Sequence, residues 1–220
     1  MEQTISGVGV LDKSMAVLDA VAVADGPCAL GELVVRTGLP KATAHRLAAA
    51  LEAHGLLRRD HEGRYLLGVR LIGLGHAAAE DWPLADAARP ALEHLRTATG
   101  ESVQLYRRDG DHRVCVVSLE SPHELRTIVP QGARLPLGKG SAGRILAGED
   151  AQERWTASVG ERAPGVASVS APVLVAGQLV AAVGISGPLA RLGDHPGVRH
   201  GPAVADAAAA IAAAAAHVRS

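Results

Sequence analysis

A short run of small and basic residues, between positions 41 and 46, has the chemistry to contact nucleic acid. The residues with charged or hydrogen-bonding side chains are Lys41, Thr43, His45 and Arg46, and the small residue Ala42 lies between them. At 100° per residue these side chains lie on one side of a predicted helix. Such a face can approach a groove closely and bond to base edges or phosphates. An ordinary helical hairpin would show the same pattern.

Two helices joined by a tight turn are predicted over residues 29–57, and another helix over residues 10–24. Gly38 can end the first helix of the pair, because glycine enters the left-handed C′ conformation without a steric penalty. Pro40 suits the first turn of the next helix, where its missing N–H costs nothing. The side of that helix away from the basic run has the spacing of a buried stripe, formed by Ala44, Leu47, Ala48 and Leu51.

A β-hairpin is predicted directly after these helices. Two short apolar runs, at 56–59 and 64–68, enclose a polar turn that ends in Gly63. Three helices followed by a hairpin predict a winged helix-turn-helix, in which the second helix of the motif enters the major groove. The hairpin would lie along the DNA backbone, and its arginines, Arg58, Arg59 and Arg64, would neutralise phosphates.

The rest of the chain predicts a linker helix and an α+β domain. Residues 69–80 have helical apolar spacing, and a further helix follows Pro83. Strands are expected at 101–106, 114–118, 126–129, 166–173 and 179–186, and a final helix at 202–218. We therefore expect a DNA-binding domain over 1–68, a linker over 69–81 and an α+β domain with an antiparallel sheet over 82–220.

Composition excludes several other classes of protein. The net charge of −1 gives no general attraction to polyanions, and the two cysteines are too few for a disulfide framework. No signal peptide or long apolar run is found, so we expect a cytoplasmic protein without a membrane partner. The motifs of serine hydrolases, zinc proteases and P-loop enzymes are missing, and His195 and His200 fall in a predicted Pro/Gly-rich loop. We expect no enzyme, no cofactor and no metal.

Several stretches together resemble the IclR family of bacterial transcription regulators, and most of all its actinobacterial members. They are GVGVLDKSMAVLDAV at the start, LPKATAHRLAAALEAHGLL in the helix pair and YLLGVRLIGLG after the hairpin, followed by LPLGKGSAGRIL, GVASVSAPV and AAVGISGP. The resemblance implies a winged helix, a linker helix and a GAF-like effector domain. It also implies a homodimer or dimer of dimers that binds double-stranded DNA at a palindromic operator, where a small metabolite alters the affinity.

The family's effector pocket corresponds to six positions of this chain. They are Ser141, Ala142, Ser158, Ser168, Gly184 and Ser186. Ser141 and Ala142 begin a predicted helix after a glycine loop, so their free N–H groups could bind an anion such as a carboxylate. Gly184 stands where the family pattern has a serine, and this removes one hydroxyl. Serines in short strands also often bond only to neighbouring backbone.

The chain has fewer residues between 147 and 160 than the family normally carries there. A helix and the strand after it are therefore expected to be shortened or absent, which would open one wall of the pocket. An alternative follows: a DNA-binding protein whose second domain only oligomerises and binds no effector. The sequence does not distinguish a repressor from an activator.

Overall fold

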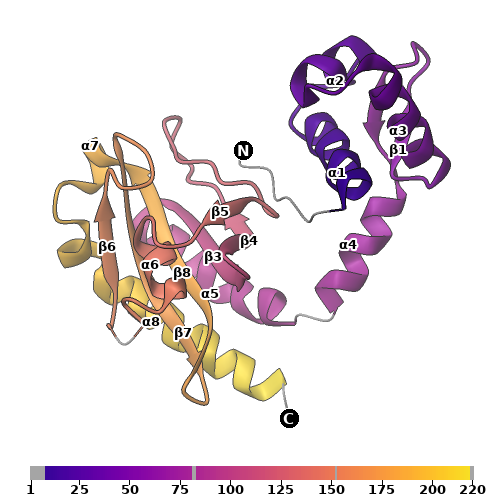
Figure 1. Cartoon of the computed structure of the whole chain (residues 1–220). Helices are drawn as coiled ribbons and strands as arrows, with labels where there is room; N and C mark the ends of the chain where they lie inside the picture. The colour runs from indigo at the N-terminus through magenta and orange to yellow at the C-terminus, as the bar shows by residue number, and fades with distance from the viewer. Residues whose placement is uncertain (1–7, 81–82, 152, 219–220) are drawn as a thin grey trace. The chain divides into compact units, whose positions relative to one another are not determined.

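The computed structural model describes residues 8–80, 83–151 and 153–218. The chain divides into two compact units, Met1–Asp81 and Trp82–Ser220 (Figure 1). The predicted boundary between the linker and the second domain falls at residues 81–82, which lie outside the described residues. No helix among the described residues is long and apolar enough to cross a membrane.

The first unit has the predicted order of three helices, a hairpin and a further helix. Its described elements are α1 (Gly9–Ala22), α2 (Leu30–Thr37), α3 (Lys41–Ala53), β1 (Leu57–Arg59), β2 (Tyr65–Leu67) and α4 (Arg70–Glu80). Gly38 ends α2 in the left-handed conformation with φ 67°, as predicted, and its N–H bonds to the carbonyl of Val34. Pro40 is the N-cap of α3. The helix-turn-helix prediction is thus confirmed, with the helix bounds shifted by one to four residues.

The hairpin is attached to the helices through a buried residue of each strand, Leu57 of β1 and Tyr65 of β2. Tyr65 of β2 exchanges two backbone hydrogen bonds of 2.8 Å with Cys28, which precedes α2. Its ring is 1% exposed and packs with buried leucines of α2, α3 and β1. An isolated two-stranded ribbon is marginal in water, so the packing of Tyr65 holds the hairpin in place.

The start of α4 is held tightly against the end of α3. Gly68 donates its N–H to the carbonyl of Leu56 at 2.9 Å, and a Cβ on Gly68 would lie 2.0 Å from the carbonyl oxygen of Gly55. Only glycine allows this approach of two backbones. The Arg70 guanidinium then donates to the carbonyl of His54, the C-cap of α3, at 3.0 Å.

The second unit is an antiparallel sheet with helices on both faces. Its described elements are α5 (Leu84–Thr99), β3 (Ser102–Asp109), β4 (His112–Leu119), β5 (Arg134–Pro136), α6 (Ser141–Ala147), β6 (Thr156–Val159), β7 (Val166–Val175), β8 (Gln178–Pro188), α7 (Leu189–Leu192) and α8 (Pro196–Val218). The sheet order is β5-β4-β3-β8-β7-β6, and every neighbouring pair is antiparallel. This confirms the α+β prediction.

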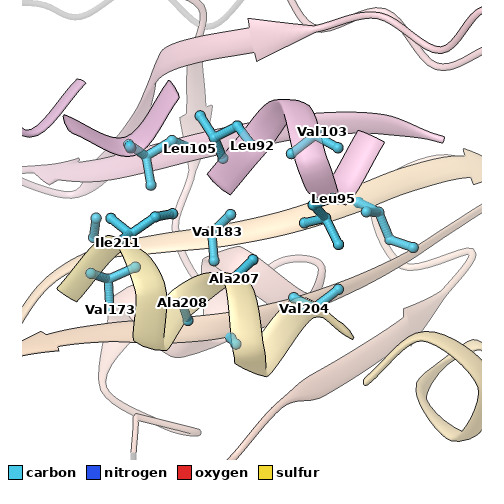
Figure 2. Close-up of a cluster of buried hydrophobic side chains, with 14 of the residues drawn as sticks. Leu92, Leu95, Val103, Leu105, Val173, Val183, Val204, Ala207, Ala208 and Ile211 are labelled. Atoms are coloured by element: carbon cyan, nitrogen blue, oxygen red, sulfur yellow. The ribbon is translucent and has the colours of Figure 1, made fainter. Parts of the chain in front are cut away.

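Successive side chains of the central strands point to opposite faces of this sheet. On one face, Leu92 of α5 and Ile211 of α8 pack with valines of β3, β7 and β8 (Figure 2). On the other face, Ile145 of α6 packs with Tyr106 and Cys115. The sheet therefore lies between α5 and α8 on one side and the short helix α6 on the other.

One predicted strand is wrong. Residues 126–129 are irregular, and the edge strand beside β4 is β5 instead. The segment is fixed by side-chain bonds: Ser102 donates its hydroxyl to the carbonyl of Thr127 at 2.7 Å. Pro130 follows directly and has no N–H to give to a ladder. Val129 nevertheless turns its side chain inward and is 3% exposed.

The segment expected to be shortened keeps a four-residue strand. α6 ends at Ala147 and β6 begins at Thr156, so residues 148–155 connect them directly. β6 pairs with β7 along its length and forms the edge of the sheet. A short strand is therefore present in this segment, and the connection from α6 contains no further helix among its described residues.

The final helix is longer than predicted. α8 begins at Pro196 rather than at 202, so His200 lies in a helix and not in a loop. Pro202 is inside the helix, six residues after its start. Gly201 faces the Trp155 indole so closely that a Cβ would lie 2.3 Å from the ring. This contact with a residue 46 positions away holds the extra turn of the helix, and no local pattern reveals it.

Burial of His200 predicts a dependence of stability on pH. The residue is 8% exposed, and burial, with the Arg199 charge in addition, lowers the pKa of its imidazole below 6.5. Because the unfolded chain takes up this proton first, the contribution of His200 to stability is full above about pH 6.5 and is lost as the pH falls toward the folded-state pKa. His200→Gln should therefore flatten the fall in unfolding free energy between pH 7 and pH 5 in urea titrations. His54→Gln, at an exposed position, is the control, and parallel curves for parent and His200→Gln would contradict the prediction.

Candidate functional site

The outer face of α3 presents the predicted basic residues to solvent. Lys41, Ala42, His45 and Arg46 are exposed and Thr43 is half-buried. The opposite side is buried as predicted, formed by Ala44, Leu47, Ala48 and Leu51. Within the described part of the chain, neither Lys41 nor Arg46 has an ion-pair partner. The face therefore keeps its positive charge available for a ligand.

The three arginines of the hairpin differ in whether their guanidinium groups are already paired with carboxylates. Arg58 is exposed and has no carboxylate partner among the described residues. Arg59 pairs with Glu52 of α3 at 2.9 Å and lies over the Tyr65 ring, 4.8 Å from its centroid. Arg64 pairs with Asp60 at 2.8 Å and with Glu62 at 3.0 Å. All three were predicted to bind phosphates, and Arg58 is the one best placed to do so.

The second candidate site is a polar cavity on the α6 side of the sheet. All six residues predicted for the effector pocket line this one cavity: Ser141, Ala142, Ser158, Ser168, Gly184 and Ser186. They come from α6, β6, β7 and β8. The volume of the cavity that the centre of a water molecule can reach is about 20 Å³. This is enough for only one or two waters.

Hydroxyl groups form a connected network at the cavity. The Ser141 hydroxyl lies 2.8 Å from that of Ser168 and 2.8 Å from that of Ser170. The Ser186 hydroxyl donates to the side-chain oxygen of Gln104 at 3.0 Å, while the Gln104 Nε2 group is buried without a partner. These serines thus bond to one another across elements, and not only to neighbouring backbone.

Ser170 occupies the space that a side chain at position 184 would need. The two residues are paired across β7 and β8, and a Cβ on Gly184 would lie 2.3 Å from the Ser170 hydroxyl oxygen. The hydroxyl that glycine removes from β8 is therefore supplied to the cavity by β7. Ser170 was not among the predicted pocket residues, although its separation of two residues from Ser168 places both on one face of a strand.

Four more polar side chains that line the cavity were missed: Gln104, Tyr106, Arg113 and Arg162. Burial raises the pKa of the Tyr106 phenol far above its usual range, so the phenol stays protonated. Burial likewise raises the pKa of the nearby Cys115 thiol to about 12, so this thiol is not a nucleophile at neutral pH. No cluster of three or more potential metal ligands occurs in the part of the chain that the structure describes.

Glu161 binds the loop that leads into α6. Its carboxylate accepts the N–H of Gly140 at 3.0 Å and pairs with Arg144 of α6 at 2.5 Å. Arg144 also pairs with Asp150 at 2.9 Å and donates to the carbonyl of Ala157. The connection between α6 and β6, and the turn after β6, are in this way held against α6 by charge rather than by an additional helix.

Both units match one family. Residues 10–61 match the IclR helix-turn-helix domain, and residues 76–154 match the C-terminal domain of the bacterial transcriptional regulator IclR. The chain belongs to the IclR family, which consists of transcriptional regulators and not of enzymes. The second match ends within the connection between α6 and β6.

Individual relatives agree with this assignment. The chain is 36% identical over 134 residues to the regulator KipR of Bacillus subtilis, covering 61% of this chain and 53% of the relative. It is 28% identical over 149 residues to the repressor IclR of Escherichia coli, covering 66% and 54%. The chain thus spans about half the length of these two relatives in the matches.

A solved structure shows the same fold over nearly the whole chain. It is an IclR homologue from Microbacterium hydrocarbonoxydans complexed with 4-hydroxybenzoate, with a TM-score of 0.78. The match covers 95% of this chain and 99% of the other at 18% identity. At this identity the likeness concerns the fold alone.

The close approach of Ser170 and position 184 gives a testable expectation. Gly184→Ser should lower the free energy of unfolding by about 1–3 kcal/mol, because the added atoms meet the Ser170 hydroxyl and the carbonyl of Val169. Adding Ser170→Gly should restore part of the loss, since it vacates one of these contacts. Urea unfolding of both variants, with Ser170→Gly alone as the matched control, measures this. Parental stability of Gly184→Ser would contradict it.

Proposed function

We propose that the protein is a sequence-specific transcription regulator that reads DNA with α3. The observation that carries this proposal is the exposed face of Lys41, Thr43, His45 and Arg46, fixed by a buried apolar stripe on a winged helix-turn-helix. The hairpin supplies Arg58 beside it for phosphate contact. Such a protein works in the cytoplasm, where its DNA is.

We further propose that it binds a palindromic operator as a homodimer or a dimer of dimers. Two-fold symmetry in the protein is what a palindromic site requires. Large apolar side chains at the start of α4 support a contact with a second copy: Val69, Ile72 and Leu74 are more than half exposed in the single chain. A short helix that exposes this much apolar side chain favours burial against a partner.

The cavity on the α6 side of the sheet is the proposed site of a small effector that alters DNA affinity. Its lining brings together hydroxyls, buried unpaired donors and cations, which is the chemistry that receives an anion such as a carboxylate. A structure of the same fold is complexed with 4-hydroxybenzoate, which supports the proposal that this protein binds a small molecule.

The small free volume of the cavity favours one alternative, a second domain that only oligomerises. A thermal-shift screen with keto acids, hydroxy acids and amino acids separates the two functions. A ligand that binds the folded state raises Tm with concentration. Saturable stabilisation supports the effector site, whereas operator binding without any stabilising ligand supports the oligomerisation domain.

Arg46 offers the most direct test of DNA reading. Arg46→Ala should weaken binding to the operator by about 1–3 kcal/mol, the value of one good base contact, and leave the fold intact. A gel shift with a fragment of the gene's own upstream region measures this, and circular dichroism verifies the fold. Arg154→Ala removes an exposed arginine from the second unit and is the control. Parental affinity of Arg46→Ala would refute the assignment of α3.

The hairpin predicts a difference between two neighbouring arginines. Arg58→Gln should reduce the slope of log affinity against log salt by about 0.9, because one phosphate contact is lost. Arg59→Gln should change the slope less, since Arg59 is paired with Glu52 and lies over Tyr65. Fluorescence anisotropy of labelled operator at several salt concentrations tests both. Equal slopes in the two variants would show that the ion pair opens on DNA.

A further inference from the structure

Arg113 is a buried cation without a carboxylate partner. It is 3% exposed, and no ion pair to it occurs among the described residues. Burial lowers the pKa of its guanidinium, which means that the surroundings oppose its charge. A buried charge is costly unless it is paired, so this residue requires an explanation that the fold alone does not give.

The guanidinium is held so that one of its edges makes no hydrogen bond. Its Nη1 donates to the carbonyls of Pro136 and Lys139 at 2.6 and 2.7 Å. The carbon of the group lies 5.4 Å from the centroid of the Tyr106 ring. Nε is buried without a partner, and no acceptor for Nη2 occurs in the described chain. The Nε–Nη2 edge is the one that receives a carboxylate through two parallel hydrogen bonds.

Gly143 makes this arrangement possible. A Cβ at position 143 would lie 2.2 Å from Nη1 of Arg113, so any larger residue would displace the guanidinium. The Nη2 atom lies 3.8 Å from the position of a Cβ on Gly140, at the entrance to α6. The backbone contacts therefore hold the unbonded edge of Arg113 in one orientation beside the cavity, which reduces the ordering cost of binding a ligand there.

A second cation lines the same cavity. Arg162, in the turn between β6 and β7, is half-buried and has no ion-pair partner in the described chain. Its charge adds to burial in lowering the pKa of Arg113, so the two guanidinium groups are close enough to repel. No Asp or Glu is among the lining residues, and the buried Nε2 of Gln104 adds another unused donor.

We propose that the cavity binds a short dicarboxylate, with one carboxylate on the Nε–Nη2 edge of Arg113 and the other neutralised by Arg162. This inference rests on the proposed effector role of the cavity and specifies the ligand. A single carboxylate would leave one cation unpaired, and a ligand without acceptors would leave the donors of Arg113 and Gln104 unused. Because the free volume of the cavity holds only one or two waters, the cavity has to widen to admit even a short dicarboxylate, and a long one is excluded.

The experiment uses the full chain and four probes: succinate, acetate, 4-hydroxybenzoate and inorganic phosphate. Calorimetry and thermal shift should show saturable binding of succinate, about tenfold or more tighter than acetate. Arg162→Gln should reduce succinate affinity to the level of acetate. Arg113→Lys, which keeps the charge and loses the two-bond edge, should weaken both carboxylates by about tenfold or more. Arg154→Gln is the charge-matched control.

Each other result overturns the inference. If acetate or 4-hydroxybenzoate binds as tightly as succinate, the proposed role of a second carboxylate is rejected. If phosphate binds more tightly than succinate, the proposed carboxylate class of the ligand is rejected. Succinate binding that survives both Arg113→Lys and Arg162→Gln places the ligand elsewhere. A gel shift of the parental chain with operator is run in parallel. Intact operator binding without any anion response rejects this ligand and leaves the DNA-reading function standing, whereas loss of operator binding itself rejects the proposed function.

Discussion

The alternation of side chains across the sheet of the second unit is the constraint on which its candidate site depends. Each central strand sends one residue into the core under α5 and α8 and the next toward α6, as Val169 and Ser170 do. A slip of one residue would place serines in the apolar core and valines in the cavity. The register that builds the core therefore also collects the polar groups of the cavity.

Elements with strong local signals could be predicted from the sequence, and elements held by distant contacts could not. Gly38 and Pro40 mark the helix pair by their own backbone preferences, and the structure places them as expected. Residues 126–129 look like a strand, yet a side-chain bond from Ser102 fixes them in an irregular form. The start of α8 depends on Trp155, far away in the chain.

The same distinction applies to the cavity. The resemblance to a family indicated six of its residues, and Ser170 was missed although it lies two residues from Ser168 on the same face of β7. Nothing near Arg113 in the sequence distinguishes it from the other arginines, because its partners, the carbonyls of Pro136 and Lys139, come from another element. Because the net charge is −1, the total charge does not indicate where an anion binds. The pairing of each arginine does: arginines bound to carboxylates support the fold, and unpaired arginines are the candidates for binding an anionic ligand.

The backbone contact between Gly68 and Gly55 has a mechanical consequence. With the Arg70 guanidinium bound to the carbonyl of His54 at the end of α3, the start of α4 is in direct contact with the helix that we propose to read DNA. Because the backbones of Gly68 and Gly55 are in direct contact, the start of α4 has no space in which to move independently of the end of α3. Rotation of α4 about its own start would turn α3 with it, so a twist too small to break any contact in the first unit could still take α3 out of register with a groove.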